Sequence, residues 1–226
     1  MIKVIIFICI LLPVNLFAQG FDIYKKGEGA KYYMKMQNNP DAEISIYFAE
    51  VKKENISIEF FIYAQNTLIP IKLYQQFLLA KKADGSLMMK ESYIQGPDEK
   101  FPQRMSPETF TNHNGIELND FFFSDEKKLK TSLVGNEDLQ IVAGKTKTQH
   151  YRKINNGQHI DFWVSDDSKP LGLVKLISKN EKVAEQNYTI ELQAILKNVS
   201  ATINPKNAKP LDKNGKKLLN GIQTFK

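Results

Sequence analysis

Cysteine is almost absent from this chain, which limits how the fold can be stabilised. The only cysteine among the 226 residues is Cys9, inside an apolar run near the amino terminus. Ile6, Phe7 and Ile8 precede it instead of the small residues that a lipidation site needs, so we expect no lipid anchor there. One cysteine cannot form a disulfide within the chain. The fold must therefore be held together by its core.

Long apolar runs are also lacking, except for one at the start. Lys3 gives a positive beginning, residues 4–12 carry no charge, and Ala18 is a small residue just before Gln19. This pattern is typical of a cleaved export signal over residues 1–18. The alternative is a membrane anchor, but an uncharged span of about 20 residues is reached only by including proline and amide residues. We expect a periplasmic or secreted protein with no stable membrane span, and the lack of disulfides favours a bacterial periplasm.

Arginine is scarce, and this bears on the class of partner. Arg104 and Arg152 are the only two, while lysine brings the formal net charge to +6. The lysines come in scattered pairs such as 52–53, 81–82 and 127–128, which fall at predicted turns. Nucleic-acid binding uses clustered basic residues with interleaved aromatics. We therefore expect no nucleic-acid partner, with weak attraction to an anionic membrane surface as the alternative.

Catalytic signals are missing as well. Neither Ser165 nor Ser168 lies on a glycine-flanked turn with a partnered histidine, which a serine nucleophile would need. Gly135, Gly144 and Gly157 are single turn glycines and do not form a phosphate-binding loop. The sequence therefore predicts a protein that is not an enzyme and that carries no cofactor.

A metal site is a weaker hypothesis. Besides His113, the chain has His150 and His159, which flank a predicted hairpin, and Asp161 shares the face of His159. Zinc needs three or four such ligands within reach of one another. The plainer interpretation is two half-exposed polar residues on a hairpin, so we expect no metal.

The clearest feature that is present is a run of strands and turns at 139–178. Asn156-Gly157 supplies the positive φ angles of a tight hairpin turn. In the strand that follows, alternation places Phe162 on one side and Trp163 on the other. We expect the remaining strands to pair with this meander, and Phe162 to be buried against Ile190 or Leu192.

Other strands are predicted over 30–37, 44–49, 56–63, 68–80, 87–95 and 188–196. In 44–49, 56–63 and 188–196 the basis is a period of two between apolar and polar residues. Residues 96–115 are predicted as a loop with a helical turn at Ser106, followed by a short helix within 116–129. We expect eight to ten antiparallel strands in one domain over residues 19–203, and a loosely ordered carboxyl-terminal tail over 204–226.

A resemblance supports the same fold. Ala143-Gly144, His150-Tyr151, Phe162-Trp163-Val164-Ser165 and the stretch 170–175 resemble the central strands of exported bacterial proteins grouped with the periplasmic lipoprotein carriers and lipoprotein-sorting proteins of the Lol type. The resemblance covers roughly residues 135–197. It implies a mainly β fold of class α+β: a curved antiparallel sheet, an unclosed half-barrel, with short helices on its concave face. In that family an apolar cavity between sheet and helices takes acyl chains.

The candidate ligand-binding residues are aromatic. Phe61, Tyr63 and Trp163 lie on the strand face opposite the predicted core. Large exposed apolar groups mark a binding surface or need a cover. The expected cover is the segment of Phe121, Phe122 and Phe123, leaving an apolar pocket beneath. The alternative is a fully packed sandwich with no cavity.

Two classes of function follow. The first is a periplasmic, non-enzymatic binding protein for a lipid, an acyl chain or another apolar ligand, with a lipid or an acylated protein as its partner. The second is a structural or interaction subunit of a cell-envelope assembly, with an envelope protein as partner and no small-molecule ligand.

Overall fold

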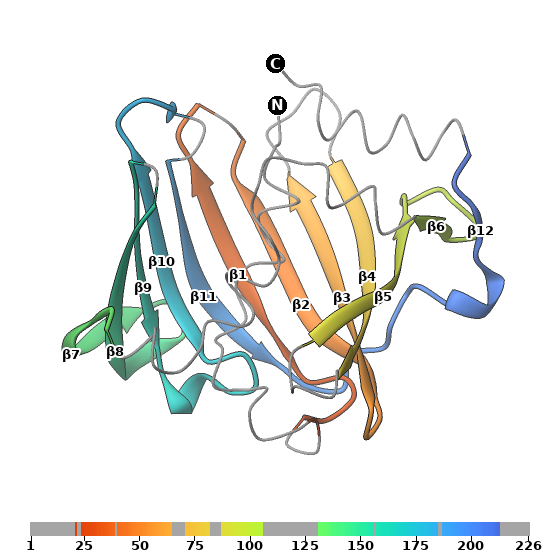
Figure 1. The fold of residues 1–226 in the computed structure, drawn as a ribbon, viewed down its shortest axis with the longest axis horizontal. Helices are drawn as coiled ribbons and strands as arrows, with labels where there is room; N and C mark the ends of the chain where they lie inside the picture. The colour runs from red at the N-terminus through yellow and green to blue at the C-terminus, as the bar shows by residue number, and fades with distance from the viewer. Residues whose placement is uncertain are drawn as a thin grey trace.

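Twelve strands form one unclosed, curved sheet in the computed structural model of this chain (Figure 1). The structure describes residues 21, 24–38, 40–64, 71–81, 87–105, 131–155, 157–184 and 187–212. The strands are β1 (Gly29–Met36), β2 (Ala42–Val51), β3 (Asn55–Ala64), β4 (Ile71–Lys81), β5 (Leu87–Gln95), β6 (Gln103–Met105), β7 (Leu133–Ile141), β8 (Gly144–Asn155), β9 (Gln158–Val164), β10 (Leu173–Asn180), β11 (Tyr188–Leu196) and β12 (Lys209–Pro210). The predicted mainly β fold with a curved antiparallel sheet is confirmed.

The spatial order of the strands is β12-β6-β5-β4-β3-β2-β1-β11-β10-β9-β8-β7. Two antiparallel meanders, β1 to β6 and β7 to β11, are joined where the first strand pairs with β11. The stretch predicted to organise the sheet therefore occupies one end of it, and only β10 pairs onward to β11. The sequence also missed the two short strands β6 and β12, whose pairing is parallel.

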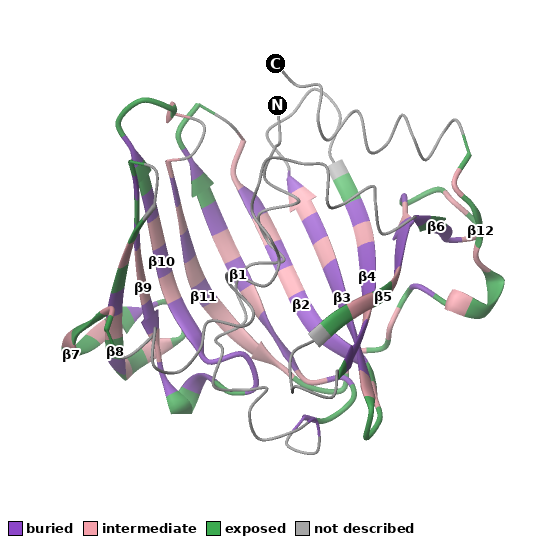
Figure 2. Cartoon of the chain, viewed as in Figure 1, coloured by how far each residue is buried: buried purple, intermediate pink, exposed green. Residues whose placement is uncertain are grey.

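Strand register divides the sheet into two faces. We call inner the face that carries Ile44 of β2, because its cross-strand partners Tyr32 and Ile62 are also fully buried. We call outer the face that carries the next residue, Ser45, which lies opposite Phe61. Figure 2 shows buried and partly exposed residues alternating along β1 to β4. This period of two is the reason why the sequence pattern identified these strands.

Most of the core belongs to the inner face. Its buried apolar residues on β1 to β5, β10 and β11 include Ala30, Tyr32, Met34, Ile44, Ile46, Phe48, Ile58, Phe60, Ile62, Leu73, Phe77, Ile94, Leu176, Ile190 and Leu192. Phe21 and Tyr24 join this cluster from the segment before β1, with the Tyr24 ring 4.5 Å from that of Phe48. The inner face is therefore mainly apolar, with Gln75 and Ser92 among its buried polar residues.

One packing prediction needs correction. Phe162 is on the inner face as predicted, but it is only partly buried and packs at the margin of the core. Its direct cross-strand partners are Leu176 on β10 and Tyr151 on β8, whose ring lies 5.2 Å away. Ile190 is one strand further on, opposite Leu176. The register between β9 and β11 depends on β10, which the alternation within each strand does not reveal.

The segment after β11 returns across the sheet to the β6 edge. It forms a 3-10 turn, η4 (Pro205–Asn207), in which the Lys206 N–H donates to Oδ1 of Asn204. The Lys209 N–H then donates to the Pro102 carbonyl at 2.9 Å. Residues 204–212 of the predicted loose tail are thus attached to the sheet, and 213–226 lie outside the described residues. The same is true of the predicted signal, of the turn at Ser106 and of the helix predicted within 116–129.

Candidate functional site

Gln75 is a polar side chain on the inner face, and its strand neighbours there are apolar. Gln75 is the central residue of the β4 sequence Leu73-Tyr74-Gln75-Gln76-Phe77, and it is 2% exposed. Its cross-strand partners are Phe60 on β3 and Ile94 on β5. Phe77 on the same face packs edge-on against Phe60, with ring centroids 5.6 Å apart. A primary amide is therefore placed inside an otherwise apolar surface.

The carbonyl oxygen of that amide, Oε1 of Gln75, is buried and has no hydrogen-bond partner among the described residues. Leaving a buried polar group unpaired costs about 1–3 kcal/mol. Such groups are rare in folded proteins, and each one needs an explanation. Gln75 is thus the feature of the inner face that packing alone does not account for.

The outer face carries two of the predicted ligand-binding residues. Phe61 and Tyr63 of β3 are both partly exposed, and their rings are nearly parallel, 6.5 Å apart at an angle of 7°. Tyr74 of β4 stacks on Phe61 at 4.7 Å, and Lys72 Nζ lies 5.5 Å above the Tyr63 ring. On the β2 side their direct partners are Ser45 and Glu43. The aromatic residues that the sequence placed opposite the core therefore pack partly against one another.

Trp163 lies on the same outer face but far from this aromatic group. One register row links them: Lys72, Tyr63, Glu43, Tyr33, Glu191, Lys175, Trp163 and His150 are successive cross-strand partners. Four strands, β2, β1, β11 and β10, separate β3 from β9. At about 4.8 Å per strand the two groups are roughly 24 Å apart along the sheet. The structure therefore does not bring Phe61, Tyr63 and Trp163 into one pocket.

A polar network surrounds Trp163 instead. The Trp163 ring stacks on His150 at 4.4 Å, and its indole N–H donates to the Glu137 carboxylate. The two His150 ring nitrogens face carboxylates on either side, Nδ1 at 3.2 Å from Glu137 and Nε2 at 2.6 Å from Asp161. Arg152 Nε donates to Asp161 at 2.8 Å. This arrangement is an ion-pair and stacking cluster that fixes the orientation of β7, β8 and β9.

The structure shows where the three residues of the metal hypothesis lie. His159 is opposite Ile154, whereas His150 is opposite Trp163, so the two histidines that flank the hairpin are not cross-strand partners. No group of three or more histidine, cysteine or acidic residues in the described part of the chain is arranged to hold a metal ion. Phe121, Phe122 and Phe123 lie outside the described residues, so their predicted role as a cover stays a prediction.

A buried carboxylate on the outer face was missed by the sequence. Glu59 is fully buried and accepts four hydrogen bonds, from the Tyr47 hydroxyl at 2.6 Å, Gln76 Nε2 at 2.9 Å, and the N–H groups of Thr202 and Ile203 at 2.8 and 3.0 Å. Burial raises the pKa of Glu59 above its ordinary value, although these hydrogen bonds act in the opposite direction. Glu59 thus attaches the segment after β11 to the outer face.

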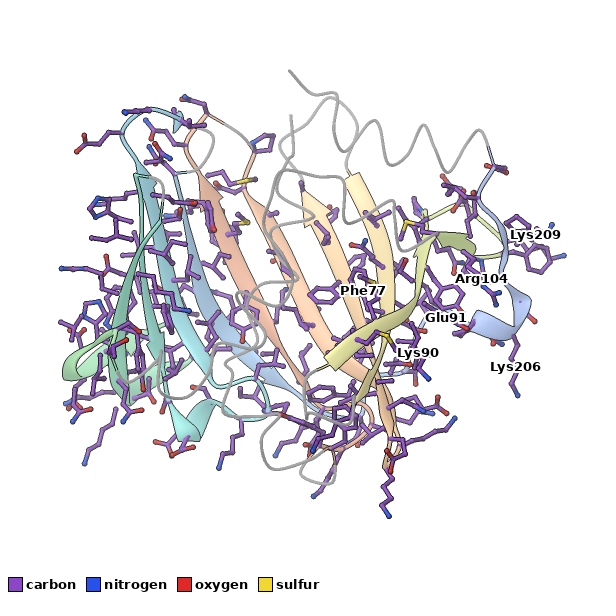
Figure 3. The ribbon with its side chains drawn as sticks, viewed as in Figure 1. Phe77, Lys90, Glu91, Arg104, Lys206 and Lys209 are labelled. Atoms are coloured by element: carbon purple, nitrogen blue, oxygen red, sulfur yellow. The ribbon has the colours of Figure 1, made fainter. Side chains whose placement is uncertain are left out.

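The edge formed by β5, β6 and β12 is rich in exposed positive charge. Figure 3 shows Lys90, Arg104, Lys206 and Lys209 gathered at this edge. Lys209 also lies 4.3 Å over the Phe101 ring. None of the four forms an ion pair with another residue of the described chain, whereas several acids elsewhere are paired. The edge is therefore a positively charged surface, at residues that the paired lysines of the sequence did not indicate.

Two hollows open on the surface of the described chain. One, of about 630 Å³, lies between the β7–β8 hairpin and the loop from Ser165 to Gly172. The other, of about 470 Å³, lies at the ends of β1, β10 and β11, near Met36 and Tyr188. Neither contains Phe61, Tyr63 or Gln75. Within the described residues, no helix is long and apolar enough to cross a membrane.

Comparisons with known proteins add little to this geometry. No protein-family model matches the chain, and no curated protein sequence matches it. Among solved structures the chain is similar to the crystal structure of MucB, with a TM-score of 0.41 and 10% sequence identity. The match covers 83% of this chain and 58% of the MucB chain. The chain therefore spans less than two thirds of the length of MucB. The likeness is distant and concerns the course of the backbone alone.

Proposed function

We propose that this chain is an exported, non-enzymatic binding protein for an apolar or acyl ligand, which it takes on the inner face of the sheet. The observation that carries the proposal is the difference between the two faces. From β1 to β5 the inner face is built from buried isoleucine, leucine and phenylalanine, whereas the outer face alternates aromatic residues with Lys31, Glu43 and Glu191. Ligand sites for small molecules are largely apolar with a few placed polar groups.

The inner face is favoured over the outer aromatic residues that the sequence suggested. Phe61 is stacked between Tyr74 and Tyr63, and Trp163 is engaged with His150 and Glu137. These contacts already use the ring faces that a ligand would need. The two aromatic groups lie roughly 24 Å apart along the sheet, so one acyl-chain pocket cannot be lined by both.

The test compares two adjacent phenylalanines on opposite faces of β3. A fluorescent fatty-acid analogue is titrated into the wild type, Phe60→Leu and Phe61→Leu, and probe emission is followed. Phe60 is buried on the inner face, so Phe60→Leu should weaken binding several-fold, while Phe61→Leu should leave it unchanged. Native mass spectrometry and lipid extraction of the purified protein supply a second readout. Absence of probe binding and of copurified lipid would remove the proposal.

A second candidate function rests on a different part of the molecule. The β7–β8 hairpin exposes Val134, Val142 and Ile154, with Val142 71% exposed at its tip. β7 is also the last strand of the sheet and is nine residues long. Long edge strands and exposed apolar side chains favour contact with another chain. If no apolar ligand binds, an interaction subunit of an envelope assembly becomes the better proposal.

A further inference from the structure

We propose that the ligand of the inner face is a neutral amphiphile whose polar end carries a hydroxyl group, and that Gln75 selects it. This inference rests on the proposed function and names the class of ligand. Gln75 Oε1 is buried without a partner in the described chain, at the centre of β4. An unpaired acceptor at this position is stabilised when a bound molecule supplies a donor.

The chemistry around Gln75 decides which polar group fits. Its inner-face neighbours Leu73, Phe77, Phe60 and Ile94 are all apolar and buried. No cation lies among these four, so an ionised carboxylate or phosphate would be buried there without a counter-charge. A neutral head group avoids that cost. The side chain therefore disfavours free fatty acids in their ionised form.

A hydroxyl group fits the unpaired end of the amide. Gln75 makes no hydrogen bond through Oε1, which can only accept one. A hydroxyl group donates, so it supplies the hydrogen bond that Oε1 lacks. An ester carbonyl only accepts and cannot pair with Oε1. The amide thus separates hydroxylated amphiphiles from methyl esters of the same chain length.

The experiment uses three probes with one acyl chain: 1-monopalmitoylglycerol, methyl palmitate and palmitate at pH 8. Each displaces the fluorescent fatty-acid analogue from the wild-type protein, from Gln75→Leu and from the control Gln140→Leu. Gln140 is an exposed glutamine on β7, at the far end of the sheet. The wild type and the control should bind the monoglyceride about tenfold more tightly than the methyl ester, the factor that one buried hydrogen bond commonly supplies.

Gln75→Leu should lose this preference and bind the monoglyceride and the methyl ester alike. The wild type should bind palmitate most weakly of the three probes. The variant should be at least as stable as the wild type, because it removes a buried unpaired oxygen. If Gln75→Leu does not fold, Gln75→Met, which is unbranched at the β and γ carbons, replaces it. Equal binding of all three probes by the wild type, or an unchanged preference in the variant, overturns the role of Gln75 alone. Failure of every probe to bind overturns the proposed function as well.

Discussion

Removing the Glu59 carboxylate should release the segment after β11 and lower the free energy of unfolding. In Glu59→Ala four donors lose their acceptor in a fully buried place. The Tyr47 hydroxyl can rotate and Gln76 keeps the Ile203 carbonyl at 3.3 Å, but the N–H groups of Thr202 and Ile203 cannot turn away. At about 1–3 kcal/mol for each unpaired donor, and with the desolvation of the carboxylate removed, we expect a net loss of about 2–4 kcal/mol.

Two assays check this value. Urea unfolding followed by circular dichroism gives the global loss, and limited trypsin digestion at Lys206 reports release of the segment. The control is Glu50→Ala, an exposed glutamate whose ion pair with Lys52 is at 2.9 Å and should contribute less than about 0.5 kcal/mol. If Glu59→Ala and Glu50→Ala unfold alike, and digestion at Lys206 does not accelerate, the four hydrogen bonds do not hold the segment.

The same carboxylate predicts a pH dependence. Because burial raises the pKa of Glu59 above 4.5, the folded chain binds this proton more tightly than the unfolded chain. The contribution of this proton to stability is complete below pH 4.5 and is lost as the pH rises through the folded value. Glu59→Gln, which cannot titrate, should lack that decline. An identical pH profile of unfolding for the two proteins would contradict the assignment.

Three further predictions use single substitutions. Gly29→Ala should prevent stable folding, because an added Cβ would lie 2.0 Å from the Ile46 carbonyl, whereas Gly135→Ala meets nothing within 4 Å and should be neutral in thermal melts. Ile190→Ala should cost about 2–5 kcal/mol and Phe162→Ala clearly less, since Phe162 is only partly buried; equal melting shifts would contradict this. His150→Ala should shift the fluorescence emission of Trp163, the single tryptophan, because the two rings are stacked. Binding of a ligand to the inner face should leave this emission unchanged, because Trp163 lies on the outer face.

The strands were predictable because alternation is a local property. In β2, β3 and β11 the apolar residues recur at every second position, and the structure places each strand within two or three residues of the prediction. The order of the strands was not predictable in this way. Any strand with one apolar face can pair with β1, and the choice of β11 depends on contacts between segments that are far apart in the sequence.

Gln75 and Glu59 show what the pattern within a single strand cannot predict. The spacing of Leu73, Gln75 and Phe77 places the glutamine on the inner face, but alternation does not show that its amide oxygen has no partner there. Glu59 falls on the outer face by alternation. It is buried because Thr202 and Ile203 cover it, and no pattern within β3 carries that information.

The pairing of β1 with β11 sets a condition on how the protein folds. A ribosome releases Gly29 long before Leu196, its register partner, so β1 can acquire only its β2 neighbour while the chain is being made. Contacts between residues so far apart in sequence form late and slowly. A nascent chain without Tyr188–Leu196 would keep one side of β1 open. Chaperones would therefore bind this protein while its sheet is still incomplete. A chain truncated before β11 should aggregate and not remain as a smaller folded unit.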